Sequence, residues 1–294
     1  MRALGVGLIG CGRLAERGYV DAIRKARGVC LAAVADPEQE RCHSLGTGVP
    51  AYADAASLIA AGVADAVIVA TPAAAHYEAA RLASAAGMPA LIEKPPAASA
   101  AEARAMAELD PQPVFGFNRR FEPGIAALRN RMPPSGKLEI ALALHHPRDS
   151  WGSYVVADDA LLKLGPHLID LVRWLTRSEI VEPRMPELAE TRATLELVLG
   201  RGRAWISCST DSRPLDQIEV RRGDRMIASY SAAGLLRRGL RRLRHPIGAG
   251  ALVRSLALQL EAFASAAHSR REDLGTVEDG VAVMRVIEAA RGSR

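Results

Sequence analysis

Two short segments of the chain contain side chains that could transfer a proton. The first, ALIEKPPA at 90–97, places Glu93 and Lys94 at the end of an apolar run and directly before two prolines. Proline keeps the preceding residue out of the helical region, so Lys94 is expected to have an extended backbone. A lysine can act as an acid or a base when burial or positive charge lowers its pKa toward neutrality. Taken alone, this segment also describes a surface lysine that ends a strand.

The second segment, KLGPHLID at 163–170, carries a histidine and two charged residues at helical spacing. Lys163 and His167 are four residues apart and share one helix face, and Asp170 follows three residues later. His167 could hydrogen-bond a reacting group, or it could be a histidine packed under a sheet at the start of a helix. The spacing leaves both interpretations open.

Glycines at 5, 7, 10 and 12 allow the dinucleotide pattern GxGxxG/A to be placed twice. In the first placement, Gly5 and Gly7 lie inside an apolar run typical of a strand. In the second, Gly10 ends that run and an amphipathic helix follows, so free N–H groups and the positive end of a helix dipole meet at the turn. Gly10 makes the tight turn, and Gly12 lets a pyrophosphate approach the backbone. The second placement therefore predicts a dinucleotide site, with contacts from Gly10, Gly12, Arg13 and Leu14.

An acidic residue stands at the end of the second apolar run, where such a site needs one. Asp36, in LAAVADPE, can accept hydrogen bonds from the adenosine ribose hydroxyls and would repel a 2′-phosphate. This favours NAD(H) as the cofactor. Arg41 lies near enough in the sequence to keep NADP(H) open.

Residues 1–118 alternate short apolar runs with helical patterns, which is the βαβ rhythm of a parallel sheet. Two of the helical patterns end at Gly62 and Gly87, as helices often do. The predicted strands are 4–10, 30–36, 65–70, 89–93 and 113–117.

The rhythm changes after about residue 120. A helix at 158–176 precedes alternating, β-rich runs, which predict an antiparallel sheet, and two helical stretches close the chain. The fold class expected is α/β: a doubly wound Rossmann sheet at 1–118, then an α+β domain at 119–294 whose last helix could pack back on the first domain. The β-rich runs are 191–199, 203–210, 216–222 and 225–231, and the closing helices are 250–268 and 277–291.

The chain has 294 residues, of which 49% are hydrophobic and 24% charged, as expected for a globular protein. Its formal net charge is +5, and arginines are concentrated at 235–245. No aromatic residue alternates with them, so a solvated helix face or loop is favoured over a nucleic-acid site. An anionic ligand or a partner subunit is the minority alternative.

Metal, disulfide and membrane signals are weak. The four cysteines form no CxxC pair and are expected to be reduced. His145 and His146 are adjacent, so their side chains would diverge on a strand, and no metal site is expected. The reduced cysteines predict a cytoplasmic protein. No apolar run is long enough to cross a bilayer, and no cleavage pattern follows the first one, so no signal peptide is expected.

Together with the other motifs, the segments 90–97 and 163–170 resemble those of the glucose–fructose oxidoreductase / inositol dehydrogenase (Gfo/Idh/MocA) family. The resemblance implies a Rossmann domain, an open, mostly antiparallel sheet domain, and NAD(P)-dependent hydride transfer on sugars or similar polyols. It also implies a small-molecule substrate and a homodimer or homotetramer formed through that sheet. The motifs that carry it, in order along nearly the whole chain, are GVGLIGCGRLA, VADPEQER, ATPAAAHYEAA, EKPPA, GFNRRFEP, GPHLIDLVRWL and TVEDGVAVMRVIEAARGS.

The resemblance implies roles for individual residues. Lys94 matches the family's acid/base lysine, and His167 matches its histidine before Leu-Ile-Asp. Arg120 is expected either to have a structural role or to lie on the substrate side of the site. Asp170 is expected on the substrate side. The residues implied to lie near the cofactor are Thr71, Pro72, His76, Glu93 and Lys94.

One position departs from the family pattern. Members commonly read D-x-G-x-H, whereas Lys163 stands here in place of the aspartate. Lys163 could bind an anionic substrate group, or Asp158, Asp159 or Asp170 could supply the missing carboxylate. Alternatively, ordinary sugar oxidation could have been lost.

Three functional hypotheses follow. The main one is an NAD(P)-dependent oxidoreductase acting on a carbonyl/alcohol pair of a sugar, sugar derivative or similar metabolite, with Lys94, His167 and Lys163 at the catalytic site. The second keeps the fold and cofactor but reduces an imine or a specialised metabolite. The third, favoured by Lys163 alone, is a non-catalytic nucleotide-binding or sensing protein.

Overall fold

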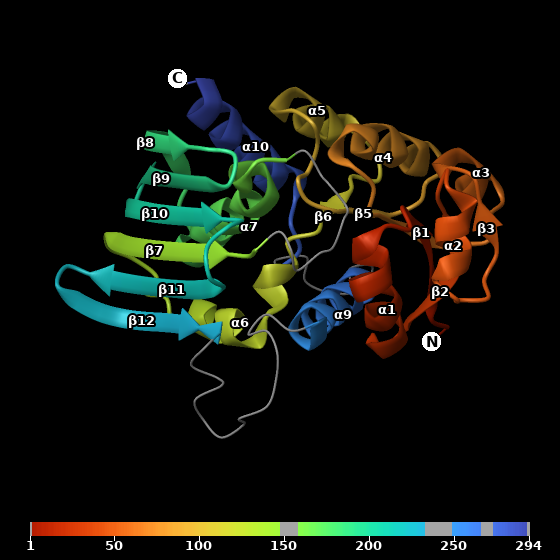
Figure 1. Ribbon diagram of the computed structural model, residues 1–294, viewed down its shortest axis with the longest axis horizontal. Helices are drawn as coiled ribbons and strands as arrows, with labels where there is room; N and C mark the ends of the chain where they lie inside the picture. Colours follow the sequence, from red (N-terminus) through yellow and green to blue (C-terminus); the bar gives the residue numbers. More distant parts are fainter. Residues whose placement is uncertain (1, 148–157, 233–248, 266–272, 293–294) are drawn as a thin grey trace. The chain divides into compact units, whose positions relative to one another are not determined.

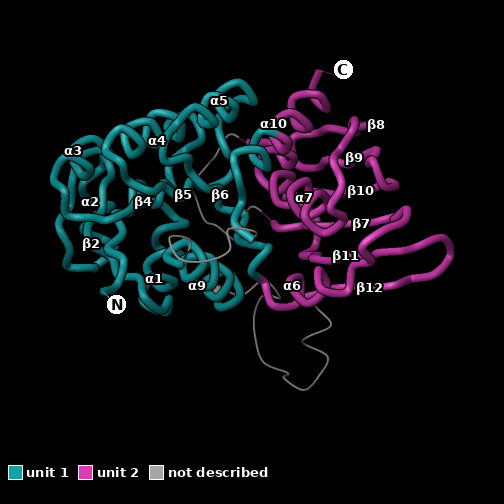
Figure 2. The backbone as a smooth tube through the Cα atoms, turned by 180° about the vertical axis from the view of Figure 1, so that it is seen from behind, with its two compact units in different colours: residues 1–121, 249–281 teal, residues 122–248, 282–294 magenta. Residues whose placement is uncertain are grey.

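The computed structural model describes residues 2–147, 158–232, 249–265 and 273–292 (Figure 1). The chain divides into two compact units, which Figure 2 shows in different colours. Unit 1 comprises Met1–Phe121 and Ala249–Val281, and unit 2 comprises Glu122–Gly248 and Ala282–Arg294. Each unit is built on one six-stranded sheet.

The sheet of unit 1 is parallel, with the strand order β3-β2-β1-β4-β5-β6. The central strands are apolar and buried, as expected when helices cover both faces of a parallel sheet. The order reverses between β1 and β4, which is where doubly wound sheets bind their ligands. The predicted Rossmann sheet is confirmed, with β3 as an additional strand. The strands are β1 (Leu4–Ile9), β2 (Val29–Ala35), β3 (Ala51–Tyr52), β4 (Ala66–Val69), β5 (Ala90–Ile92) and β6 (Val114–Phe115).

Local sequence signals mark the ends of several helices in unit 1. The Asp54 side chain accepts the Ser57 N–H at 2.7 Å, and Ser99 caps its helix in the same way. Gly62 and Gly87 follow their helices with φ of 62° and 66°, the left-handed conformation that ends a helix. The helices are η1 (Ala15–Tyr19), α1 (Val20–Lys25), α2 (Gln39–Ser44), α3 (Ala55–Ala60), η2 (Ala73–Ala75), α4 (His76–Ala85), α5 (Ala100–Ala105), η3 (Met106–Glu108) and η4 (Asn118–Phe121).

One helix from late in the sequence completes unit 1. α9 (Ala249–Ser265) packs against η1 and α1, and its Leu256 and Leu260 join Tyr19 in the unit's hydrophobic core. The sequence predicts a second domain that runs from 119 to the end of the chain. In the structure, the first division falls after Phe121, and residues 249–281 belong to unit 1.

The sheet of unit 2 has the order β12-β11-β7-β10-β9-β8. Only β7 and β10 pair in parallel among these neighbours; the other pairs are antiparallel. The long apolar helix α7 (Ala160–Thr176) covers one face of this sheet. The strands are β7 (Leu138–His145), β8 (Ile180–Leu188), β9 (Arg192–Leu199), β10 (Gly202–Ser209), β11 (Leu215–Arg222) and β12 (Arg225–Ser231), with α6 (Pro123–Asn130) before them and α10 (Val277–Gly292) after them.

Three elements of unit 2 were not predicted. β7 alternates buried and more exposed residues, which is the pattern of a half-buried strand. β8 contains Pro183 and Pro186, which weaken the strand signal, and the structure places it at the sheet edge, where proline is tolerated. α6 begins with Pro123 in its first turn, a position that suits proline.

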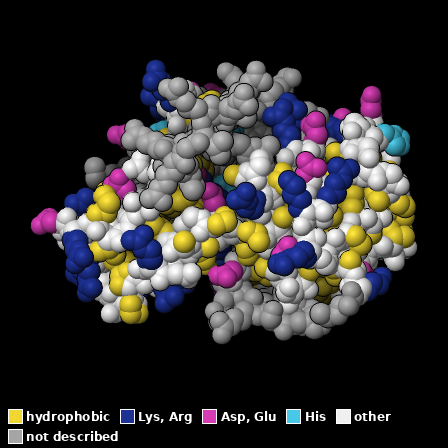
Figure 3. Space-filling view, turned by 90° about the horizontal axis from the view of Figure 1, so that it is seen from below, with side chains coloured by type: hydrophobic (Ala, Val, Ile, Leu, Met, Phe, Trp, Pro, Cys, Tyr) yellow, Lys and Arg dark blue, Asp and Glu magenta, His cyan; other side chains and the backbone are white. Residues whose placement is uncertain are grey.

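Surface features agree with a mixed charge distribution. On the face shown in Figure 3, Lys and Arg side chains outside the grey atoms are spread among acidic and apolar ones. Within the part of the chain that the structure describes, no helix is long and apolar enough to cross a membrane. The arginine-rich stretch 235–245 lies outside the described residues.

Candidate active site

The turn after β1 contains two glycines with different surroundings. Gly10 is packed closely against backbone atoms, and Gly12 faces open space. Gly10 has φ of 96°, and a Cβ there would lie 2.7 Å from the backbone carbonyl of Ala70. A Cβ on Gly12, in contrast, would meet no atom within 4 Å. The turn therefore fits closely against the strand-β4 loop on one side and is open on the other, as a pyrophosphate site requires.

Arg13 and Leu14 begin the helix that follows this turn. Arg13 pairs with Glu16 at 3.4 Å, and Leu14 packs on the hydrophobic core. Their backbone N–H groups lie at the helix start, which is the part of these two residues that can serve a phosphate.

Asp36 follows β2 and is 5% exposed. One carboxylate oxygen accepts the Cys11 N–H at 2.8 Å, and the other accepts the Glu38 N–H at 2.9 Å. Asp36 thus holds the glycine turn in place, and a carboxylate retains further acceptor capacity for ribose hydroxyls. Arg41 pairs with Glu38 at 2.7 Å.

The loop after β4 and the loop after β5 are joined by a histidine. His76 begins α4 and is fully buried; its Nε2 lies 2.8 Å from the Thr71 carbonyl oxygen and its Nδ1 lies 3.0 Å from that of Pro95. Burial holds the pKa of His76 below its usual value, against the opposing effect of the carbonyl groups. The Thr71 Oγ1 is buried and forms no hydrogen bond to the described residues, whereas Pro72 is exposed.

Glu93 and Lys94 follow β5 at the same edge of the sheet. Glu93 is 4% exposed, and its Oε2 accepts the Lys94 N–H at 3.0 Å. Its Oε1 accepts the Tyr19 hydroxyl at 2.6 Å. Burial raises the pKa of Glu93, and the Tyr19 hydrogen bond and the Lys94 charge oppose that rise. Lys94 itself is half-buried.

In unit 2, α7 carries Lys163, His167 and Asp170. Lys163 and His167 are half-buried, and Asp170 is 1% exposed. Asp159 caps the helix by accepting the Leu162 N–H at 2.8 Å, and its other oxygen pairs with Arg291 at 2.6 Å. These two contacts already engage Asp159, one of the three carboxylates considered as a replacement for the family's aspartate.

Arg120 is buried within unit 1. Its guanidinium pairs with Asp279 at 2.8 Å, donates to the Leu274 carbonyl at 3.2 Å and lies 5.5 Å from the centre of the Phe117 ring. These contacts tie the segment after β6 to the returning part of the chain. They support the structural alternative for Arg120 over the substrate-side one.

The structure thus gathers the predicted residues of unit 1 at one edge of its sheet. The glycine turn, Asp36, Thr71 and Lys94 follow β1, β2, β4 and β5, all at their carboxyl ends. His167, Lys163 and Asp170 belong to unit 2. The sequence did not predict the hydrogen bond from the Tyr19 hydroxyl to Glu93. The only sequence signal for Tyr19 is being the one aromatic residue in the helix after the glycine turn.

Among the described residues, no group of three or more His, Cys, Asp and Glu side chains could hold a metal ion. The Nε2 atom of His145 lies within hydrogen-bond distance, 3.1 Å, of the Ser207 hydroxyl.

Known proteins match this sequence. Residues 4–112 match the GFO_IDH_MocA model, described as the oxidoreductase family with an NAD-binding Rossmann fold. The chain is also 29% identical to the rhizopine catabolism protein MocA of Rhizobium meliloti, over 97% of this chain and 93% of that protein.

Solved structures share the fold. The scyllo-inositol dehydrogenase of Lactobacillus casei, with NAD(H) and scyllo-inositol bound, aligns with a TM-score of 0.83 at 17% identity, over 99% of this chain and 97% of that chain. GenD2 from gentamicin A biosynthesis, in complex with NAD, aligns with a TM-score of 0.80 at 20% identity, over 100% and 94% of the two chains.

The parallel sheet order, the glycine turn and the acidic residue after β2 define an NAD-binding Rossmann protein of the oxidoreductase class. Residues 4–112 match the model of the Gfo/Idh/MocA oxidoreductase family, and the chain is similar to MocA along nearly its whole length.

Proposed function

We propose that the protein transfers a hydride between NAD(H) and a carbonyl/alcohol pair of a sugar, sugar derivative or similar polyol, with Lys94 as the proton donor and acceptor. The observation that carries this proposal is the position of Lys94. It follows β5 at the edge of the sheet where the glycine turn lies, and Glu93 holds its backbone N–H at 3.0 Å.

The residues of unit 1 fit a dinucleotide. Gly12 leaves open space for a pyrophosphate, Asp36 offers acceptors to a ribose, and the buried Thr71 hydroxyl has no hydrogen-bond partner among the described residues. NAD would accept or supply the hydride when bound. The negative charge of Asp36 disfavours a 2′-phosphate, and Arg41 is engaged by Glu38, so NAD(H) is favoured over NADP(H).

Lys94 would handle the proton that accompanies the hydride. In the oxidation direction, neutral Lys94 takes the proton of the reacting hydroxyl group; in the reduction direction, protonated Lys94 returns a proton to the developing alkoxide. Lys94 is half-buried. The positive charge of bound NAD⁺ beside the amine would favour the neutral form that accepts a proton.

Two residues of α7 would contact the substrate. His167 would hydrogen-bond the reacting oxygen or a neighbouring hydroxyl, and Lys163 would bind an anionic or polar group of the substrate. Asp159 is occupied as a helix cap and by Arg291, which supports a changed substrate contact at position 163 over a displaced carboxylate from Asp159. The similarity to a rhizopine catabolism protein and to a scyllo-inositol dehydrogenase supports a polyol as the substrate class.

A second candidate is a reductase of a specialised metabolite. Lys163 in place of the usual aspartate supports it, as does the fold shared with GenD2 of gentamicin A biosynthesis. Both candidates use the same unit 1 residues and differ in what α7 recognises.

We further infer a homodimer or homotetramer that forms through the open face of the unit 2 sheet. Trp205, 41% exposed, lies in one row across the strands with Glu196, Ala141 and Glu219. This row borders a hollow of about 520 Å³ on the sheet. Large aromatic residues are enriched at protein interfaces. The cytoplasmic location stays a prediction, and it rests on four free cysteines.

The test is a panel of inositols, other polyols, ketones and imines, assayed with NAD⁺ or NADH by absorbance. Lys94→Ala should lower kcat by about 100-fold or more and leave NADH affinity within about twofold. Lys25→Ala, which removes an exposed lysine at the end of α1, should keep wild-type kcat. A Lys94→Ala enzyme with most of its activity would refute the assigned role. NADH binding without turnover of any compound would favour a nucleotide sensor.

A further inference from the structure

The helix after the glycine turn is not regular. Its first part, Ala15–Tyr19, is a π-helical turn, and a regular α-helix follows from Val20. Such turns insert one extra residue into a helix and often occur at functional sites. Gly18 lies within this turn, and a Cβ there would come within 2.8 Å of the Leu256 side chain of α9. The wider turn and the close approach of α9 together determine where the next side chain, Tyr19, lies.

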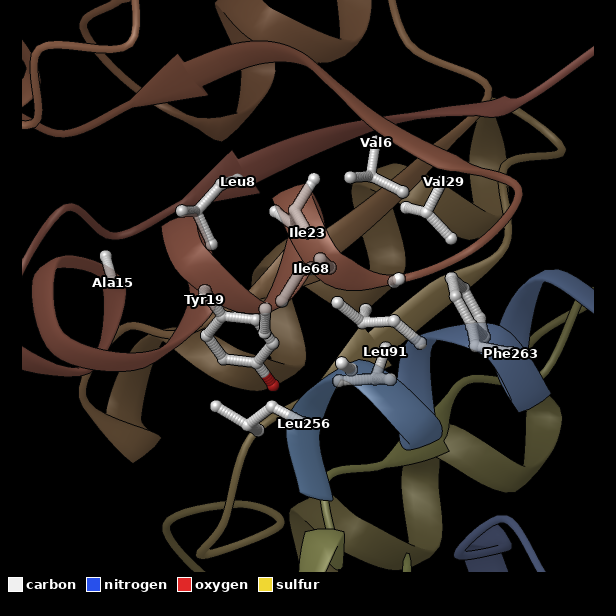
Figure 4. Close-up of a cluster of buried hydrophobic side chains, with 14 of the residues drawn as sticks. Val6, Leu8, Ala15, Tyr19, Ile23, Val29, Ile68, Leu91, Leu256 and Phe263 are labelled. Carbon is white, nitrogen blue, oxygen red and sulfur yellow. The ribbon is translucent and has the colours of Figure 1, made fainter. Parts of the chain in front are cut away.

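The Tyr19 side chain is completely buried within unit 1. Figure 4 shows its ring among Leu8, Ala15, Ile68 and Leu256, with its hydroxyl oxygen at the edge of this cluster. A buried phenol needs a hydrogen-bond partner, since an unsatisfied hydroxyl in an apolar environment is costly. Its partner is Glu93 Oε1, at 2.6 Å. The short distance is typical of a hydroxyl that donates to a carboxylate.

The same carboxylate holds the backbone of Lys94. Glu93 Oε2 accepts the Lys94 N–H at 3.0 Å, so one carboxylate is hydrogen-bonded at both oxygens. Gly116, after β6, provides the space, because a Cβ there would lie 2.9 Å from Glu93 Oε1. Glu93 therefore has little freedom to rotate as long as Tyr19 donates to it.

We propose that Tyr19 is a positioning residue for Lys94, acting through Glu93. This rests on the proposed role of Lys94 in proton transfer. The Tyr19 hydroxyl orients the Glu93 carboxylate, and the carboxylate then fixes the backbone from which the reactive amine extends. The π-helical turn thereby links the helix start that would face the dinucleotide phosphates to the residue that would exchange the proton.

The substitution that isolates this contact is Tyr19→Phe. It retains the ring in the hydrophobic cluster and removes only the hydroxyl. The matched control is Tyr230→Phe in unit 2, because the Tyr230 hydroxyl also donates to a carboxylate, that of Glu122. Loss of stability common to the two variants then reports the general cost of removing a buried tyrosine hydroxyl.

The direct measurement is hydrogen exchange of the Lys94 amide in protein without cofactor or substrate. The chain has only four lysines, Lys25, Lys94, Lys137 and Lys163, so ¹⁵N-lysine labelling isolates four backbone amides for NMR. Tyr19→Phe should speed exchange at Lys94 by about tenfold relative to the other three lysines. Tyr230→Phe should not change that ratio. An unchanged ratio in Tyr19→Phe would overturn the proposal.

Kinetics complete the test, with the substrate that gives the highest turnover in the panel. Tyr19→Phe should lower kcat by about tenfold with little change in KM for NAD⁺. Glu93→Ala should lower kcat at least as much, and adding Tyr19→Phe to it should have almost no further effect, since both act through one contact. Additive effects, or wild-type kcat in Tyr19→Phe, would contradict the proposal. Retained activity in Lys94→Ala would instead refute the proposed function, independently of the exchange result.

Discussion

Asp36 illustrates how one side chain can serve both the fold and a ligand. Its carboxylate is buried and accepts N–H groups from the glycine turn and from its own loop. The same negative charge stands at the end of β2, where a ribose would bind and where a 2′-phosphate would be repelled. Cofactor preference and the shape of the phosphate turn therefore depend on the same group.

Asp36→Asn tests this dependence. The amide keeps the size of the side chain but loses the charge and one acceptor oxygen, so NADH affinity should fall by about tenfold or more. NADPH affinity should fall much less, because the repulsion of its 2′-phosphate is removed at the same time. Titration of NADH and NADPH fluorescence measures both constants. Glu40→Gln, at an exposed glutamate of α2 that leaves Asp36 and Glu38 in place, should preserve the preference for NADH. Equal losses for both cofactors in Asp36→Asn would contradict the prediction.

Two further residues that are expected near the cofactor make buried contacts within the protein. His76 and Glu93 were both expected near the cofactor, and the structure buries both of them and directs their polar atoms at backbone groups or at Tyr19. We therefore propose that they shape the site by holding the loops that carry Thr71 and Lys94. A direct contact with the cofactor stays a prediction for both.

At the scale of elements, the loops after β4 and β5 are held together by the first residue of α4. His76 lies between the carbonyl oxygens of Thr71 and Pro95, so two strand ends share one imidazole. Burial lowers the pKa of His76 below 6.5. A histidine with a depressed pKa contributes stability above its unfolded pKa, and this stability is lost as the pH falls through 6.5 toward the folded pKa.

The free energy of unfolding of the wild-type protein should therefore decrease below pH 6.5 by roughly 1 kcal/mol for each unit of pKa depression. His76→Gln should be less stable at neutral pH and should lack this part of the pH dependence. Urea unfolding between about pH 7 and pH 5 measures the slope. His43→Gln, at an exposed histidine of α2, should follow the wild type. Identical slopes for wild type and His76→Gln would show that His76 does not titrate in this range.

At the scale of the whole molecule, each unit has its own six-stranded sheet, and the chain passes from unit 1 to unit 2, back to unit 1 and again to unit 2. α9 adds Leu256 and Leu260 to the core of unit 1, so that core depends on both ends of the sequence. In unit 2, α7 covers one sheet face, while the other presents Trp205.

Trp205→Glu tests whether this open face joins copies of the chain. It would place a third acidic group in the row with Glu196 and Glu219 and remove the aromatic contact. Light scattering coupled to size exclusion should show a dimer or tetramer for the wild type and a smaller species for the variant. Val63→Glu, at an exposed hydrophobic residue of unit 1, should leave the assembly unchanged. A monomeric wild type would refute the inferred assembly.

The parts of the fold that were predictable are those set by neighbours in the sequence. The strands of unit 1, the left-handed glycines after α3 and α4, and the turn at Gly10 follow from apolar runs and backbone conformations that few residues adopt. β8 was missed because its two prolines break the strand pattern, and only its edge position makes them tolerable.

By itself, the sequence determined the Rossmann sheet, the dinucleotide turn and the place of Lys94 at a strand end, because each depends on short-range spacing and steric limits. Only the tertiary structure decided that Tyr19 reaches Glu93, that His76 joins two loops, that Arg120 pairs with Asp279 and that α9 completes the first unit. The physical reason is separation along the sequence. Three of these four features join residues or elements that are tens to more than a hundred positions apart. Packing and burial select such partners, and local sequence patterns do not encode them.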